Sequence, residues 1–172
     1  MPWSNIMWQK PQDLQEILTQ DYRYLHQHPE LSFQETETTA WLIAQLGALG
    51  IEVLDTGLSN GLVAIIRGDQ AGKSVALRAD IDALPVREET ALPYASVAQG
   101  VMHACGHDFH TSALLGAATL LQQNRANLKG SVKLVFQPAE ELSGGAVLVL
   151  DAGVLSDVSE IYGLHVMPMI PS

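Results

Sequence analysis

The chain contains the segment Leu134-Val135-Phe136-Gln137-Pro138-Ala139-Glu140-Glu141, in which an apolar run leads directly into two adjacent carboxylates. A short apolar run that ends at a proline is typical of a strand buried on both faces, so we predict a strand over residues 132–136. Neighbouring side chains diverge on an extended backbone, so the two carboxylates would face different directions. The alternative is a solvated acidic pair at a helix start, although the flanking Pro138 and Gly144 indicate a shaped loop.

Further strands and helices alternate around this segment. Hydrophobic spacing, proline and glycine predict helices over residues 11–28, 35–49, 111–123 and 146–151, and strands over residues 51–54, 62–67, 74–78 and 160–165. Residues 88–101 show no period and are predicted to form a long loop. Apolar strands that alternate with helices indicate an α/β fold in which a mostly parallel sheet is sandwiched by helices.

Length and composition restrict the class of protein. The chain has 172 residues, of which 47% are hydrophobic and 16% charged, which suffices for one domain with a core. Its net charge of −10 argues against a nucleic-acid partner. The longest apolar runs are too short to cross a bilayer, and no signal peptide is readable. A single cysteine excludes an intrachain disulfide and fits a reducing compartment, so we expect a cytoplasmic protein.

Polar residues follow the ends of several predicted strands. These residues are Asp80, Glu140, Glu141 and His165. Open α/β sheets place their ligand sites at the carboxyl edge of the strands, so we expect these side chains to share one site.

The loop before the third predicted helix offers a second group of candidate metal ligands. If Cys105-Gly106-His107 is extended, the thiol and the imidazole point to the same side and reach one cation. Sulfur and nitrogen ligands suit zinc or another late first-row metal, and added carboxylates would admit manganese. Taken alone, Cys105 fits a buried structural thiol as well.

Each remaining candidate has two interpretations. One carboxylate of the Glu140–Glu141 pair would supply a metal ligand, while the other would move protons between water and a leaving group. Asp80 and Asp82 would bind metal or hydrogen-bond a ligand histidine, and Asp108 and His103 would support ligands in the same way. His110 is either structural or in contact with substrate. His26 and His28, at a helix end, are expected to be structural.

Four segments in this order resemble the N-acyl-amino-acid amidohydrolases, which include hippurate hydrolases and the plant hydrolases of indole-acetyl amino acids, within the wider aminoacylase and carboxypeptidase group of two-metal enzymes. The segments are His26-Gln-His-Pro-Glu-Leu-Ser32, Leu77-Arg-Ala-Asp-Ile-Asp-Ala-Leu-Pro85, Met102-His-Ala-Cys-Gly-His-Asp108 and Phe136-Gln-Pro-Ala-Glu-Glu141. The resemblance extends from about Leu14 to Pro168 and therefore covers nearly the whole chain.

The resemblance implies a set of roles for these residues. Cys105, His107, Glu141 and His165 would bind two divalent metal ions, Mn²⁺ or Zn²⁺, with Co²⁺ and Ni²⁺ as further candidates. Glu140 would be the general base. The carboxypeptidase branch carries His-x-Asp where this chain has Asp80 and Asp82, which are therefore expected, with Asp108, to support the ligands.

The resemblance also implies a function and a domain organisation. The expected activity is hydrolysis of the amide bond of small N-acyl amino acids, with a dipeptidase or carboxypeptidase and a non-catalytic remnant as alternatives. Family members are more than twice as long. Residues 1–172 would then be the N-terminal part of the catalytic metal-binding domain, inactive alone. The remainder would supply a further histidine ligand and a lid or dimerisation domain through which a full-length form would form homo-oligomers.

Overall fold

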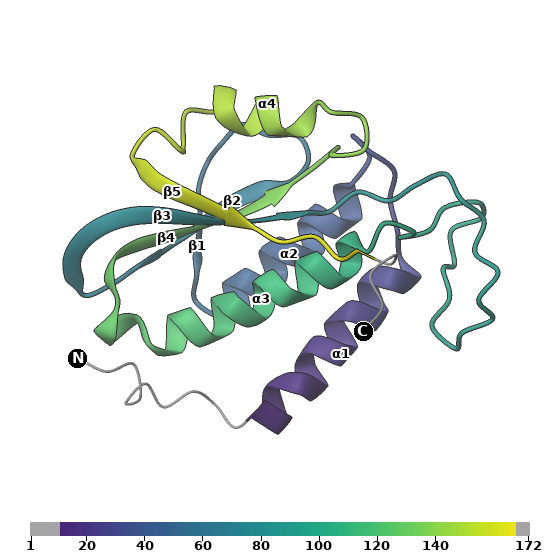
Figure 1. The fold of residues 1–172 in the computed structure, drawn as a ribbon, viewed down its shortest axis with the longest axis horizontal. Helices are drawn as coiled ribbons and strands as arrows, with labels where there is room; N and C mark the ends of the chain where they lie inside the picture. The colour runs from purple at the N-terminus through teal and green to yellow at the C-terminus, as the bar shows by residue number, and fades with distance from the viewer. Residues whose placement is uncertain (1–10, 168–172) are drawn as a thin grey trace.

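The computed structural model describes residues 11–167, which form one sheet with helices on both faces (Figure 1). The helices are α1 (Pro11–Gln27), α2 (Thr36–Ala48), α3 (His107–Gln123), α4 (Gly145–Asp151) and the short 3₁₀ turn η2 (Arg125–Asn127). The strands are β1 (Glu52–Val53), β2 (Leu62–Arg67), β3 (Gln70–Asp80), β4 (Lys129–Gln137) and β5 (Val158–Gly163). Within residues 11–167, no helix is long and apolar enough to cross a membrane.

The strand order is β1-β2-β4-β3-β5. β3 pairs in parallel with both β4 and β5, whereas β2 runs antiparallel to β1 and to β4. Four strands therefore point the same way and β2 runs against them, which confirms the α/β class and gives a mixed sheet. β2 and β3 are joined by a tight turn after Arg67, which explains the antiparallel strand: a connection this short reverses the chain and cannot build a parallel crossover.

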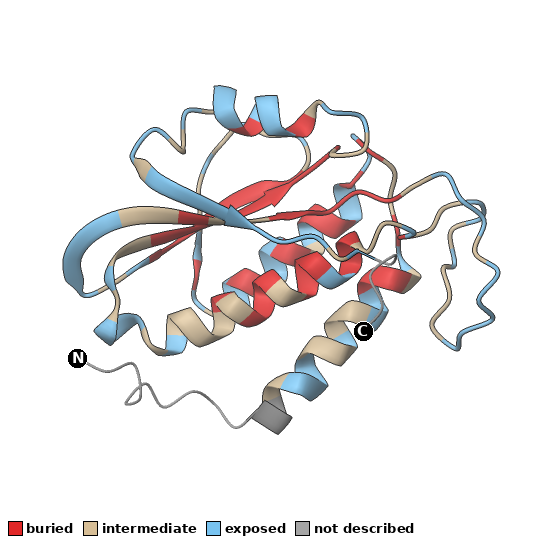
Figure 2. Ribbon diagram, in the orientation of Figure 1, coloured by how far each residue is buried: buried red, intermediate tan, exposed pale blue. Residues whose placement is uncertain are grey.

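Both faces of the sheet are covered, as the strand sequences predict. Alternate residues of β2 and β4, such as Ala64 and Leu134, face a core formed with α2 and α3. The intervening residues Val63 and Val135 face the opposite side, where they pack with Val149 of α4. Figure 2 shows buried residues along the central strands and on the helix sides that face them. Apolar residues on both faces of a strand require this double cover.

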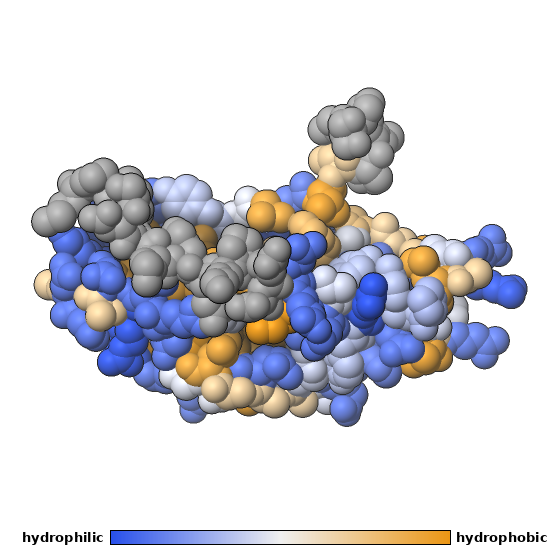
Figure 3. All heavy atoms as spheres, turned by 90° about the horizontal axis from the view of Figure 1, so that it is seen from below, coloured by the Kyte–Doolittle hydropathy of each residue, from blue (hydrophilic) through white to orange (hydrophobic). Residues whose placement is uncertain are grey.

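The outer surface is more polar, and one edge of the sheet is open. On the face seen in Figure 3, hydrophilic side chains predominate and hydrophobic ones form small separate groups. The last strand, β5, lies at the sheet edge, where Ile161 and Tyr162 are 54% and 55% exposed. Unpaired edge strands of this kind are sites where further chain can add to a sheet.

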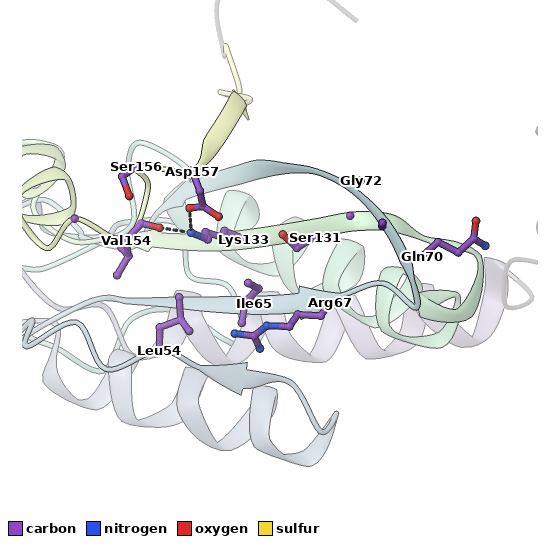
Figure 4. Close-up of a pocket in the computed structure, with 13 residues that line it drawn as sticks. Leu54, Ile65, Arg67, Gln70, Gly72, Ser131, Lys133, Val154, Ser156 and Asp157 are labelled. Carbon is purple, nitrogen blue, oxygen red and sulfur yellow. Dashed lines mark hydrogen bonds and ion pairs between the residues drawn. The ribbon is translucent and has the colours of Figure 1, made fainter.

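A cavity of about 550 Å³ lies at the amino ends of the parallel strands (Figure 4). Its walls include Gln70 at the start of β3 and Ser131 near the start of β4. The amine of Lys133 points into it but is held by the Val154 carbonyl and the Asp157 carboxylate. Its cation is therefore already neutralised, and the cavity lies at the opposite end of the strands from the polar residues singled out in the sequence.

Candidate metal centre

The parallel strands bring the predicted polar residues to one edge of the sheet. Asp80 ends β3 and pairs with Gln137 at the end of β4. Glu140 and Glu141 follow β4 in a turn, and His165 follows β5 by two residues. Because β3, β4 and β5 run in the same direction, their carboxyl ends meet, as the sequence argument required.

The segment before α3 has a different conformation from the one predicted. Residues 105–107 are not extended: Cys105 lies in a turn, Gly106 has a left-handed φ of +86°, and His107 is the first residue of α3. The helix therefore begins four residues before the predicted start at residue 111. Glycine at position 106 permits this sharp entry into the helix, since other residues rarely adopt a positive φ. The thiol and imidazole nevertheless meet, with ligand atoms of Cys105, His107 and Glu141 all within 4.8 Å of one another.

In its neutral form, His107 carries its lone pair on Nε2, the ring nitrogen near Cys105 and Glu141. Its Nδ1 lies 2.9 Å from the Asp82 carbonyl oxygen and 3.2 Å from Asp82 Oδ1, so Nδ1–H is the donor. Within residues 11–167, its buried Nε2 has no hydrogen-bond partner, and neither has the buried Oε1 of Glu141. These two atoms lie 3.8 Å apart. The Glu141 oxygen and the lone pair of a neutral His107 would repel each other, so a cation between the two atoms, either a proton on Nε2 or a metal ion, would satisfy both.

His165 is arranged in the same way. Its Nδ1–H donates to the Val166 carbonyl at 2.7 Å, which leaves the lone pair on Nε2. That atom lies 3.5 Å from the Cys105 sulfur. Both histidines thus present Nε2 toward the thiol and the carboxylates, which is the arrangement of metal-binding imidazoles whose other nitrogen donates to an oxygen.

The charge around Cys105 favours a cation over a free thiolate. Burial raises the pKa of Cys105 to about 11, and the neighbouring Glu141, Glu140 and Asp80 carboxylates contribute. Burial lowers the pKa of His107, but Asp82, Asp80 and Glu141 outweigh it and raise that pKa. The site is therefore strongly negative, and a thiol, two imidazoles and carboxylates form a donor set that fits Zn²⁺ and neighbouring divalent ions.

The two adjacent carboxylates differ in exposure. The side chain of Glu141 is 22% exposed and holds the partnerless oxygen, whereas that of Glu140 is 39% exposed. Glu140 Oε2 still lies 3.9 Å from His107 Nε2. Both carboxylates therefore border the site, with Glu141 enclosed within it and Glu140 open to an incoming molecule.

Asp82 supports the site through three hydrogen bonds. Its carboxylate accepts from the Ser32 hydroxyl at 2.6 Å, the Glu141 amide at 3.0 Å and His107 Nδ1 at 3.2 Å. Burial alone would raise the pKa of Asp82, but these bonds and that of the Glu140 amide lower it to about 2. The carboxylate is therefore ionised, and it links His107 to Glu141.

Asp80 lies beside the site, with its Oδ2 3.7 Å from His107 Nε2. Arg78 Nη1 donates to its Oδ2 at 2.6 Å, and His110 Nδ1 donates to its Oδ1 at 2.6 Å. Burial raises the pKa of Asp80, but His110, His107 and Arg78 outweigh it and lower that pKa. Asp80 is thus a fully buried carboxylate held by cationic and polar neighbours.

Asp108 contacts a helix end rather than a candidate ligand. Its Oδ2 lies 2.6 Å from His26 Nδ1, and His26 Nε2 lies 3.1 Å from Glu88 Oε1. Burial lowers the pKa of His26, but its bonds to Asp108 and Glu88 raise it overall. His26 is structural, as expected, although its partners are carboxylates and not the last carbonyls of α1. The bonds tie α1 and the long loop to the start of α3.

His103 is buried without a hydrogen-bond partner among the described residues. Both ring nitrogens lack one, and burial lowers the pKa of the imidazole to about 4. His103 therefore does not support a ligand by hydrogen bonding as expected, and it is neutral near pH 7.

Sequence reasoning did not identify two residues that hold the site. Ser32 binds Asp82, and fully buried Glu35 accepts the Ala139 amide at 2.7 Å, which fixes the turn that carries Glu140 and Glu141. His110 had been left open as structural or substrate-binding. Its spacing of three residues from His107 places both on one helix face, a signal that could have linked it to the site.

Gly145 provides a stability prediction for this turn. A Cβ at Gly145 would lie 1.5 Å from the Pro138 carbonyl oxygen, so Gly145→Ala must displace the turn beneath Glu140. We expect a loss of about 3 kcal/mol in the free energy of unfolding by urea denaturation. The control is Gly47→Ala, an exposed helical position with nothing within 4 Å, which should stabilise by about 0.5–1 kcal/mol. Equal stability of both variants would show that the turn is not tightly packed.

The second half of the chain matches a known family of peptidases. The model of peptidase family M20/M25/M40 matches residues 76–172, more than half of the chain. The chain therefore belongs to this family of hydrolases.

Individual relatives agree with the family match. The chain is 55% identical over 150 residues to an N-acetylcysteine deacetylase of Bacillus subtilis, covering 87% of this chain and 40% of the relative. It is 45% identical over 144 residues to an N-acyl-L-amino acid amidohydrolase of Geobacillus stearothermophilus, covering 83% and 39%. The chain thus spans about 40% of the length of these curated relatives, and the resemblance to N-acyl-amino-acid amidohydrolases is confirmed.

A solved structure shows the same fold. The YXEP protein of Bacillus subtilis, described as a dinuclear metal binding peptidase from the M20 family, superposes with a TM-score of 0.91 at 52% identity. The match covers 94% of this chain and 45% of that one. The α/β architecture described above is therefore that of an M20 catalytic domain in part.

Proposed function

We propose that this chain carries the metal-binding part of an enzyme that hydrolyses the amide bond of small N-acyl amino acids. The observation that carries the proposal is the pair of partnerless, buried acceptors, His107 Nε2 and Glu141 Oε1, which face each other beside the Cys105 thiol. The names of the relatives, an N-acetylcysteine deacetylase and an N-acyl-L-amino acid amidohydrolase, support the substrate class.

Two divalent ions would be held by Cys105, His107, Glu141 and His165, with Zn²⁺ and Mn²⁺ as the first candidates and Co²⁺ and Ni²⁺ as further ones. The dinuclear description of the YXEP structure supports the number of ions. When bound, such ions lower the pKa of water and stabilise negative charge on a carbonyl oxygen.

Glu140 would move the protons. Its open carboxylate borders the candidate ligands and makes no side-chain hydrogen bond to another described residue, so it is free to accept a proton from the attacking water. It would then deliver that proton to the departing amide nitrogen. Asp82, Asp80 and Asp108 would keep His107, His110 and the start of α3 in place.

The greater length of the relatives bears on the domain organisation and the activity of this chain. We propose that residues 1–172 correspond to the N-terminal part of the catalytic domain, that oligomerisation involves other parts of the polypeptide, and that this chain alone has little or no turnover. A cysteine ligand must remain reduced, so we also propose a reducing compartment, the cytoplasm.

The test of the proposed metal binding and inactivity is to purify the chain, add Mn²⁺ or Zn²⁺, and measure bound metal and cleavage of N-acyl amino acids. Stoichiometric metal with little turnover is expected; turnover equal to that of a full-length relative would contradict the inactivity.

A peptidase is the alternative, because the similar YXEP protein of Bacillus subtilis is described as a dinuclear metal binding peptidase. A panel of N-acyl amino acids and dipeptides separates the two in a full-length context. Preferential release of amino acid from acyl substrates supports our proposal, and preferential cleavage of dipeptides supports the alternative.

Metal binding is expected to release protons. Because burial, together with Glu141 and nearby carboxylates, raises the pKa of Cys105 to about 11, the thiol is protonated at neutral pH and must lose its proton when it binds a cation. Affinity should therefore rise about tenfold per pH unit between pH 6 and 8 for each thiol proton released. Titration calorimetry in two buffers of different ionisation enthalpy measures this release. Affinity independent of pH would argue against ligation by Cys105.

A further inference from the structure

His110 lies close to the proposed metal ligands and could be taken for one of them. It lies on α3 one turn after His107, is 2% exposed, and its ring centroid lies 4.5 Å from that of His165. Ligand atoms of Asp80, His107, His110 and His165 all lie within 4.8 Å of one another. Proximity alone would therefore include His110 in the metal centre.

Its hydrogen bonds give it a different role. Nδ1–H donates to Asp80 Oδ1 at 2.6 Å, and Nε2 accepts the amide of Val166 at 3.0 Å. A neutral imidazole has one donor and one acceptor nitrogen, so both are occupied. His107 and His165 differ from it: Nε2 of His107 has no hydrogen-bond partner among the described residues, and Nε2 of His165 faces the Cys105 thiol, itself a proposed ligand, at 3.5 Å.

His110 completes a chain of hydrogen bonds from the sheet to the segment after β5. Arg78 Nε donates to Gln137 Oε1 at 2.9 Å, and Arg78 Nη1 donates to Asp80 at 2.6 Å. Asp80 in turn accepts a hydrogen bond from His110 Nδ1–H, and His110 Nε2 accepts one from the Val166 amide. The chain begins on β4, crosses β3 and ends next to His165.

The segment that carries His165 has few other restraints. β5 ends at Gly163, so residues 164–167 lie beyond the strand pairing, and the side chain of His165 is exposed. Val166 also lies close to Gly106, where an added Cβ would be 2.5 Å from Val166 Cγ2. Val166 is thus held by His110 on one side and packs on the turn of Cys105 on the other.

We propose that His110 is a positioning residue that anchors the Val166 amide and thereby fixes His165 beside Cys105. This inference rests on the proposed function, in which His165 and Cys105 bind metal. The buried Asp80 carboxylate, which Arg78 holds in place, sets the tautomer of His110: it requires Nδ1–H, which leaves Nε2 as the acceptor for Val166.

The test uses three substitutions of His110 and one control. In His110→Gln the side-chain oxygen replaces the Nε2 acceptor, in His110→Asn the amide replaces the Nδ1 donor, and in His110→Phe both are lost. The control is His28→Gln, an exposed histidine at the end of α1. Two measurements are made: hydrogen exchange of the Val166 amide in metal-free protein, and affinity and absorption spectrum with Co²⁺.

We expect the Val166 amide to exchange at least about tenfold faster in His110→Phe and His110→Asn, and His110→Gln to retain most of the protection. Co²⁺ affinity should fall about 10–100-fold in the first two variants, with an altered spectrum, and be rescued in His110→Gln. His28→Gln should match the wild type in both measurements.

Three results would overturn the inference. Equal exchange at Val166 in the wild type and His110→Phe would show that the anchoring bond does not exist. Faster exchange with unchanged Co²⁺ affinity and spectrum would show a structural contact that does not position His165. A wild-type protein that binds no Co²⁺ would refute the metal site and with it the positioning role, and this failure is recognised in the wild type before any variant is compared.

Discussion

Replacing Glu140 by glutamine is expected to lower kcat for N-acyl amino acid hydrolysis about 10²–10⁴-fold in a full-length context while leaving the metal content unchanged. Glutamine keeps the size of the side chain but can neither accept the proton of water nor return it to the leaving nitrogen. Glu140 holds no other residue of the site by a hydrogen bond from its side chain among the described residues, so its loss should not disturb the ligands.

Two matched variants make this result specific. Glu141→Gln should lose metal affinity, because its enclosed oxygen is a proposed ligand. Glu89→Gln, at an exposed position of the long loop, should leave both rate and metal unchanged. Full activity in Glu140→Gln would remove the general base from the proposal, and a site that binds metal with no hydrolysis even in the wild type would favour the non-catalytic alternative.

Replacing Asp82 by alanine is expected to weaken both the fold and the metal site. Two donors, the Ser32 hydroxyl and the Glu141 amide, would lose their acceptor, at a cost of about 2–3 kcal/mol in unfolding free energy, whereas His107 Nδ1 keeps the backbone carbonyl of residue 82 at 2.9 Å. Metal affinity should fall about 10-fold, because the His107 imidazole loses one of its two acceptors and the amide of Glu141 loses the carboxylate that holds it.

Urea denaturation and metal titration measure these two effects separately. Asp55→Ala is the control, since Asp55 is exposed. Unchanged metal affinity in Asp82→Ala would show that His107 is oriented without the carboxylate. The pH dependence provides a second check in metal-free protein. Because the folded-state pKa of Asp82 is lowered to about 2, its stabilisation is complete above pH 4 and is lost as the pH falls through about 2.

Much of the fold follows from local sequence patterns. The apolar run before Pro138 is buried on both faces as predicted, because helices must cover a strand of this composition. The direction of β2 could not be predicted, since it depends on the tight turn that joins it to β3 and on its pairing with β4. β3 also begins at Gln70, four residues before the predicted start, as the strand continues directly from that turn.

The candidate site was predictable in its residue types but not in its hydrogen bonds. The parallel direction of β4 and β5 brings Glu141 and His165 to one edge of the sheet, and the turn before α3 adds Cys105 and His107. The exclusion of His110 as a ligand required knowing that both of its nitrogens are bound, by Asp80 and by the Val166 amide. Such partners lie 30 and 56 residues away in the chain, beyond the reach of local patterns.

The central claim is that the Cys105 thiol and the imidazoles of His107 and His165 share one metal centre with Glu141. The most direct measurement is a crystal structure of the Zn²⁺-loaded protein with anomalous scattering recorded at the zinc edge. We predict anomalous peaks at the carboxyl edge of β3, β4 and β5, within bonding distance of Cys105 Sγ and of the Nε2 atoms of His107 and His165. Zinc bound elsewhere, or these side chains left without a metal at saturating zinc, would contradict the account.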